Sequence, residues 1–305
     1  MLPLGLLLVF AFQPDTSMLR TLYEEKAVRV ERQYGPNDAH TADAWRDLGL
    51  FLRQWATPAD ARDALRKVLA IDEAGAATAL TLADAANLAR VSPPPDAQPL
   101  WTRVTESQDP SLVSEAFAAL GDMRDDAGDK AGAADFYRKA LDREQANSGP
   151  DSAKVAVRLN SLALVLGPRE AVPLLQRALG IDRRVWGEKH PETATTEVNL
   201  SGELQASGRF TEAVQIGVAA LANFEATLGD NHPRTAAAAS TLADGYRALK
   251  QNARAEKLYR QALAIDERAY GPSHPETLDD VRNLVEFLRD TGRAAEAKEL
   301  ETRLH

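Results

Sequence analysis

The sequence predicts an all-α fold, a solenoid of about seven stacked helical hairpins preceded by one leading helix. The first observation is a repeat, because Gly187, Gly229 and Gly271 stand 42 residues apart and similar residues surround each of them. A fixed period of this length indicates an array of stacked helical units. The second observation is helical spacing of apolar residues, as in Leu258 and Ala262. No segment alternates between apolar and polar residues over the length of a strand.

The composition limits the functions that the chain can have. Only 6% of the residues are aromatic, which suits thin helical layers packed through small residues. A formal net charge of −9 argues against nucleic acid or an anionic membrane as the partner, since both attract basic surfaces. The chain has no cysteine, which excludes disulfides, thiolate metal sites and cysteine catalysis.

Residues 1–14 form an apolar leader, and we expect one continuous solenoid over residues 15–305. The apolar run 2–12 has the length of a secretory signal core, although no Lys or Arg precedes it. It is too short to span a membrane, which takes about 20 apolar residues. The sequence slightly favours an exported, for example periplasmic, protein; the alternative is a cytoplasmic chain whose leader caps the first repeat.

The array begins with a lone second helix, because residues 17–35 align with the second helix of the later units. The next helix ends near Trp55, and Thr57-Pro58 begins its partner. Prolines at 93–95 and at 168 shorten the second and fourth units by about one turn, since proline cannot continue a helix.

Glycine or asparagine marks the turn inside the remaining units, where a left-handed residue ends the first helix. These turns lie near Gly128, Gly208, Asn252 and Gly292. The last helix, residues 294–305, is short and charged, as expected of a terminal cap.

The repeat text itself resembles a known family. Three features carry the resemblance: a second-helix pattern, a His-Pro turn and an Asn-Leu pair in the following helix. They occur at Ala255, Leu258, Ala262, Leu263, Ile265 and Gly271, at His190-Pro191, His232-Pro233 and His274-Pro275, and at Asn199-Leu200 and Asn283-Leu284. Together they resemble tetratricopeptide repeats of the 42-residue kind found in kinesin light chains and many bacterial proteins. The resemblance implies a right-handed superhelix whose first helices line a concave groove for peptides or partner surfaces, without catalysis.

The residues offer no catalytic or metal-binding constellation. Three of the five histidines, His190, His232 and His274, occupy equivalent turns, and helices pack about 8–10 Å apart, so such a ladder cannot converge on one ion. We expect these histidines to fix the turns. Acidic neighbours such as Asp279 and Asp280 diverge on a helix and are interpreted as a solvated face. The sequence therefore predicts no enzyme, no cofactor and no metal.

The remaining candidates are groove positions, counted from the small residue after the Asn-Leu pair. They are Arg46, Arg53, Asn160, Gln205, Asp244, Arg247, Arg282, Glu286 and Arg289. For the asparagine of the pair itself, as in Asn199, a structural hydrogen bond is favoured over a ligand contact.

The arginines among these candidates predict an acidic partner, because guanidinium groups bind carboxylates bidentately. Arg247, Arg282 and Arg289 would hold an acidic peptide or a C-terminal carboxylate. The alternative is pairing within the helix, for instance of Glu286 with Arg282 or Arg289.

We therefore expect a non-catalytic scaffold that binds a protein or peptide, with a regulatory or sensor arm of a multi-chain assembly as the alternative.

Overall fold

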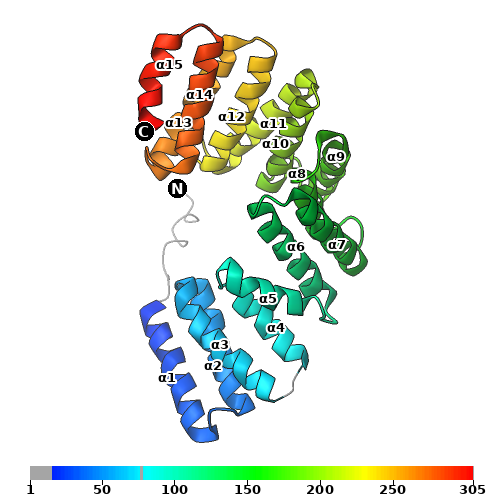
Figure 1. The fold of residues 1–305 in the computed structure, drawn as a ribbon, viewed down its shortest axis with the longest axis vertical. Helices are drawn as coiled ribbons and strands as arrows, with labels where there is room; N and C mark the ends of the chain where they lie inside the picture. Colours follow the sequence, from blue (N-terminus) through cyan, green and yellow to red (C-terminus); the bar gives the residue numbers. More distant parts are fainter. Residues whose placement is uncertain (1–15, 76–77, 305) are drawn as a thin grey trace, which may run out of the picture. The chain divides into compact units, whose positions relative to one another are not determined.

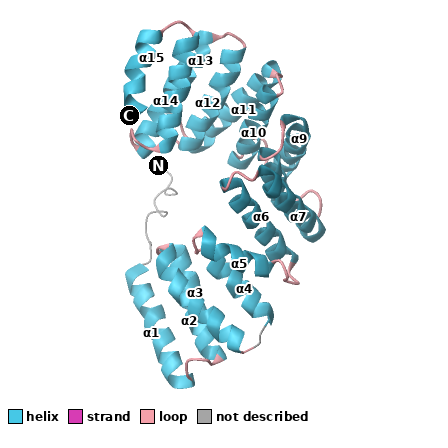
Figure 2. Cartoon of the chain, in the orientation of Figure 1, coloured by secondary structure: helices cyan, strands magenta, loops and turns pink. Residues whose placement is uncertain are grey.

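The computed structural model describes residues 16–75 and 78–304, and the regular structure in these ranges is helical throughout (Figures 1 and 2). The described residues form fifteen α-helices, a leading helix and seven consecutive pairs, which confirms the predicted fold class. The chain forms two compact units, Met1–Asp129 (unit 1) and Lys130–His305 (unit 2). The predicted leader lies outside the described residues. It remains a prediction, as does the continuous array over residues 15–305.

Unit 1 carries the leading helix and the first hairpins. Its helices are α1 (Thr16–Tyr34), α2 (Ala39–Trp55), α3 (Pro58–Ala74), α4 (Thr78–Ala89), α5 (Pro94–Val104) and α6 (Pro110–Asp126). Helices α4 and α5 have 12 and 11 residues, against 17 each in α2 and α3. The hairpin is therefore shortened as predicted, and α5 begins at Pro94, the second of the three prolines.

Unit 2 carries the most regular repeats. Its helices are α7 (Lys130–Ser148), α8 (Ala153–Leu164), α9 (Pro168–Val185), α10 (Pro191–Ala206), α11 (Phe210–Leu228), α12 (Pro233–Ala248), α13 (Asn252–Tyr270), α14 (Pro275–Asp290) and α15 (Ala294–Glu301), followed by a 3₁₀ turn, η1 (Thr302–Leu304). Helix α8 has 12 residues against 16 in α10, so the second predicted shortening is also confirmed.

The His-Pro turns cap the helices that follow them. Nδ1 of His190, His232 and His274 accepts a hydrogen bond from the backbone N–H two residues later, at 3.2, 3.1 and 3.3 Å. Proline occupies the first position of each helix, where its missing N–H costs nothing. The histidines are therefore helix caps, as predicted.

The glycine before each turn allows the chain to reverse. Gly187, Gly229 and Gly271 have φ near +90°, a region that side chains disfavour. The threonine six residues after each glycine donates its hydroxyl to the glycine carbonyl at 2.7–2.9 Å. This contact fixes the angle at which each new hairpin leaves the previous one.

The first helices of unit 2 form one layer. Helix α10 contacts α12, and α12 contacts α14, while α11 and α13 pack between successive first helices (Figure 1). Alanines fill the closest approaches, and Ala239, Ala255 and Ala262 are fully buried. This layer positions the groove candidates of unit 2.

Candidate functional site

Arg46 is held inside unit 1 by an ion network. Its guanidinium donates from Nη2 to Asp72 on α3 at 2.8 Å, and from Nε and Nη2 to Asp84 on α4 at 2.9 and 3.0 Å. It also pairs with Asp43 on its own helix. The side chain is only 17% exposed, so Arg46 balances two buried carboxylates and is not free for a ligand.

The next two candidates are also engaged by their neighbours. Arg53 donates to the amide oxygen of Asn87 on α4 at 2.9 Å. Gln205 donates to the carbonyl of Thr241 on α12 at 2.9 Å. Both contacts join one first helix to the next, in unit 1 for Arg53 and in unit 2 for Gln205, so these side chains fix the spacing of the first helices within each unit.

Asn160 belongs to a hydrogen-bond chain between repeats. It donates to the hydroxyl of Thr196 at 2.9 Å and accepts from Asn199 at 3.0 Å. Thr196 donates in turn to Asp182 at 2.7 Å. The structural hydrogen bond expected of Asn199 is therefore present, and Asn160 is its acceptor.

Asp244 and Arg247 on α12 both bond to side chains of neighbouring helices. Tyr259 donates its hydroxyl to Asp244 at 2.5 Å. Arg247 donates to Glu286 at 2.9 Å and from Nε to Asp290 at 3.0 Å. The surrounding helices raise the pKa of Asp244 by removing water, although the Tyr259 hydrogen bond acts in the opposite direction.

The side chains of Arg282 and Arg289 are exposed, at 56% and 55%. Arg282 pairs with Asp279 within α14, and Arg289 pairs with Glu301 on α15. The arginines are therefore paired within the chain, as the alternative expected. Glu286, however, pairs with Arg247 on α12 and not with Arg282 or Arg289 on its own helix. The three arginines expected to bind an acidic peptide each hold a carboxylate of this chain.

The layer opens into a hollow of about 460 Å³ beside these residues. Helices α12, α13 and α14 line it, and five of the lining side chains are carboxylic acids. These acids are Asp244, Asp266, Glu276, Asp279 and Asp280. The hollow is thus acidic, whereas the sequence indicated a basic surface at this end.

Asp280 corrects one interpretation of the sequence. Asp279 and Asp280 were both expected on a solvated face, yet Asp280 is 7% exposed while the Asp279 side chain is 58% exposed. Burial raises the pKa of Asp280 to about 7, and the nearby Asp266 adds to the effect. A signal was present in the repeat alignment, because Asp280 occupies the position of Thr196, which faces the preceding second helix.

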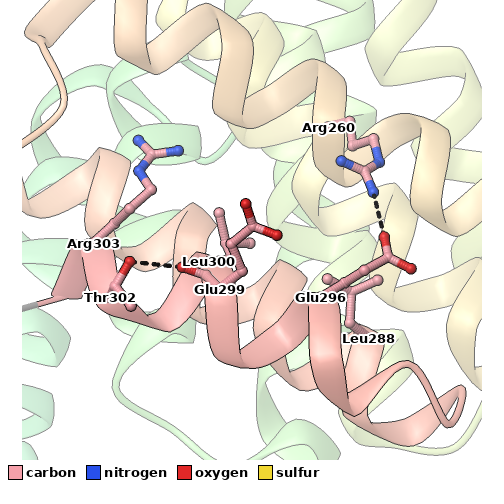
Figure 3. Close-up of a pocket in the computed structure, with 7 residues that line it drawn as sticks. All are labelled: Arg260, Leu288, Glu296, Glu299, Leu300, Thr302 and Arg303. Atoms are coloured by element: carbon pink, nitrogen blue, oxygen red, sulfur yellow. Dashed lines mark hydrogen bonds and ion pairs between the residues drawn. The ribbon is translucent and has the colours of Figure 1, made fainter.

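A second hollow lies at the C-terminal cap and is shown in Figure 3. It has a volume of about 390 Å³ and is lined from α13, α14, α15 and η1. Its cations are engaged, since Arg260 pairs with Glu256 and Glu296, and Arg303 pairs with Glu267. This hollow offers charges that are already balanced.

Within 16–75 and 78–304, no three His, Asp or Glu side chains are arranged to hold a metal ion. No helix in these ranges has the length and apolar character needed to cross a membrane.

These observations define a class of protein, an α-solenoid whose first helices present a polar surface. The tetratricopeptide-repeat family matches residues 204–268 and 235–304, so the C-terminal repeats are tetratricopeptide repeats, as their residues predicted. None of the curated proteins matches the sequence.

Solved structures with the same fold extend this comparison. A putative kinesin light chain of Podosopora anserina with nearly identical TPR-like repeats is 23% identical, over 65% of this chain and 95% of that chain, with a TM-score of 0.54. BtubC (BKLC) from P. vanneervenii is 23% identical over 73% and 89%, with a TM-score of 0.56. A Rap protein complexed with Competence and Sporulation Factor is 15% identical over 94% and 76%, with a TM-score of 0.61. At these identities the likeness shows the fold alone, the kinesin-light-chain-like repeat solenoid.

Proposed function

We propose that this chain is a non-catalytic scaffold that binds a segment of a partner protein on the first-helix layer of unit 2. The observation that carries the proposal is the hollow of about 460 Å³ between α12 and α14, because it leaves polar side chains open to a ligand. The similar fold of the Rap protein, which was solved with Competence and Sporulation Factor, supports a binding role.

A regulatory or sensor arm of a multi-chain assembly is the alternative. The similar fold of the Cut9-Hcn1 hetero-tetramer favours it, at 16% identity over 90% of this chain and 47% of that chain and a TM-score of 0.60. Co-purification with one stoichiometric effector chain would support the arm, whereas exchangeable partners would support the scaffold.

The arginines on this face suggest an acidic partner. An acidic partner would bind Arg247, Arg282 and Arg289 by replacing their intramolecular carboxylates. Replacement of Arg282 and Arg289 by alanine should then abolish partner binding, and unchanged binding would exclude this reading.

Site-specific photocrosslinking tests the binding surface. A photoreactive amino acid replaces Ala237, which is exposed and lines the hollow, or Val218 on α11, which is 45% exposed and lies outside it. In the native source we expect one partner to crosslink from position 237 and not from position 218. Equal crosslinking from both positions, or none from position 237, would refute the proposed surface.

A further inference from the structure

In unit 1, two buried carboxylates share one guanidinium. Asp72 on the second helix α3 and Asp84 on the next first helix α4 are 7% and 1% exposed. Arg46 on α2 reaches both with hydrogen bonds of 2.8–3.0 Å. Burial of an unpaired carboxylate is costly, and this guanidinium offsets part of the cost by binding two at once. Burial and the neighbouring Asp84 still raise the pKa of Asp72 to about 6.

The same three repeat positions recur in unit 2, with one change. Asp266 follows Ala-Ile in α13 as Asp72 does in α3, and Asp280 stands three residues before an Asn-Leu pair as Asp84 does. The position of Arg46, two residues before the leucine of its helix, is taken by Ser240 in α12. Unit 2 thus keeps both carboxylates and lacks the guanidinium.

The missing cation leaves unsatisfied atoms. Asp266 and Asp280 are each 7% exposed, and Oδ1 of Asp266 and Oδ2 of Asp280 have no hydrogen-bond partner within the described structure. Both side chains line the hollow of about 460 Å³. Ser240 lies beside Asp280 and lowers its pKa, but a hydroxyl supplies no charge.

An earlier repeat, two before this one, shows a different solution. Asp182 on α9 occupies the position of Asp266, and Thr196 on α10 occupies that of Asp280. There the threonine hydroxyl donates to the carboxylate at 2.7 Å. The Asp266–Asp280 pair has neither a threonine hydroxyl that donates between its two positions nor an arginine that binds both.

The charges around the hollow favour a cation. Asp244 on α12 and Glu276 on α14 add two acids to the buried pair, whereas Asp279, which also lines the hollow, is paired with Arg282. The nearby arginines are committed elsewhere, since Arg234 pairs with Glu192 at 3.0 Å and Arg282 pairs with Asp279. His274 caps α14 through its Nδ1. A concave surface lined by one sign of charge concentrates ligands of the opposite sign.

We propose that this hollow binds the guanidinium group of an arginine side chain from the partner protein, between Asp266 and Asp280, at the place that Arg46 fills in unit 1. The inference rests on the proposed function, because it names the chemistry of the segment that the first-helix layer binds. Arginine fits better than a metal ion, since the described residues hold no metal-ligating group of three. It fits better than lysine because one planar fork can reach two carboxylates.

Binding should depend on pH. Burial raises the pKa of Asp280 to about 7 and also raises the pKa of Asp266, with Glu276 adding to both and His274 opposing for Asp266. The cation needs the ionised pair, so affinity increases as the pH rises through 7 and falls in acid.

The test uses the full chain and the probe acetyl-Gly-Gly-Arg-Gly-Gly-amide, titrated at pH 8 and followed by NMR. The control probe carries citrulline, which keeps the shape of arginine without its charge. We expect saturable binding of the arginine probe, at least about tenfold weaker binding of the citrulline probe, and a similar weakening at pH 5.5. Equal binding of the two probes would overturn the proposal, and equal binding of a lysine probe would overturn its assignment to arginine.

Three variants locate the site. Ser240→Arg supplies the guanidinium in cis as in unit 1, and Asp280→Thr copies the Asp182–Thr196 pair; both should fold and lose probe binding. Asp182→Asn is the matched control and should keep it. Circular dichroism checks folding, and Ser240→Arg should raise the melting temperature. Probe binding that survives in a folded Ser240→Arg variant would refute the site.

One further experiment distinguishes a failure of the arginine site from a failure of the proposed scaffold function. The crosslink from position 237 is repeated in the Ser240→Arg variant with the native partner. Loss of the crosslink supports the arginine site. If the crosslink persists, the inference fails and the scaffold stands, whereas a wild-type chain that never crosslinks refutes the scaffold itself.

Discussion

The replacement of Asp280 by asparagine should remove a pH dependence from the stability of the α13–α14 contact. The pKa of Asp280 is about 7 in the folded chain, against an ordinary value of 3.8. Between these values the folded chain holds a proton that the unfolded chain has lost. Stability from this group is therefore fully present below about pH 4, falls as the pH rises, and is constant above about pH 7.

The size of the effect follows from the shift of about three pKa units, which corresponds to roughly 4 kcal/mol at most. Two of these units fall between pH 5 and pH 8, so the stability of the Asp280→Asn variant relative to wild type should increase by about 2–3 kcal/mol over that range. Asparagine keeps the shape of the side chain and cannot ionise, so it removes the cost of a buried charge.

Native-state hydrogen exchange of α13 and α14 measures this change locally. Wild type and variant are compared at each pH, which cancels the intrinsic dependence of exchange on pH. Asp279→Asn is the control, since its side chain is exposed and should show less than about 1 kcal/mol at either pH. The reasoning is refuted if the Asp280→Asn difference is the same at pH 5 and pH 8, or if the variant is less stable than wild type at pH 8.

Three further predictions concern the scaffold. Arg46→Ala leaves Asp72 and Asp84 buried without their cation and should destabilise unit 1 by about 3–5 kcal/mol in urea unfolding, whereas Arg282→Ala should cost less than about 1 kcal/mol. His274→Ala removes the cap of α14 and should cost about 1 kcal/mol, while His274→Asn restores a side-chain acceptor and should cost less; equal losses in the two variants would contradict the capping role. Gly49→Ala places a Cβ 2.7 Å from Leu65, so it should destabilise the fold by about 1–3 kcal/mol and lower the melting temperature. Gly202→Ala is the control, because its Cβ meets nothing within 4 Å and should leave the melting temperature unchanged. Similar effects of the two changes would contradict the close packing of α2 on α3.

Most of the fold was predictable because the period and the turn residues act locally. The prolines at the starts of α10, α12 and α14, the glycines with positive φ and the His-Pro caps are read from adjacent residues. The shortened hairpins were predictable for the same reason, since the prolines at 93–95 and the Gly167-Pro168 pair separate one helix from the next. These features need no knowledge of which helices touch.

The candidate site was less predictable because its charges are paired between helices. Arg247 binds Glu286 and Asp290 on the next first helix, although the sequence separation of about 40 residues gives no local sign of it. Asp280 lies next to an exposed aspartate in the sequence and yet is buried, because neighbouring residues point in different directions on a helix. The alignment of equivalent repeat positions was the signal that could have identified it.

The residue at one repeat position, Arg46 in unit 1 and Ser240 in unit 2, decides whether a buried carboxylate pair stabilises the fold or is left to bind a ligand. Where arginine stands, as at Arg46, one guanidinium binds both carboxylates and joins the helices. Where serine stands, as at Ser240, the same geometry leaves Asp266 and Asp280 with unsatisfied oxygens beside an open hollow. A buried charge pair without its counterion destabilises a fold, so its free energy is available to whatever ligand supplies that counterion. An arginine from a partner would therefore bind at this position and stabilise α13 against α14 at the same time.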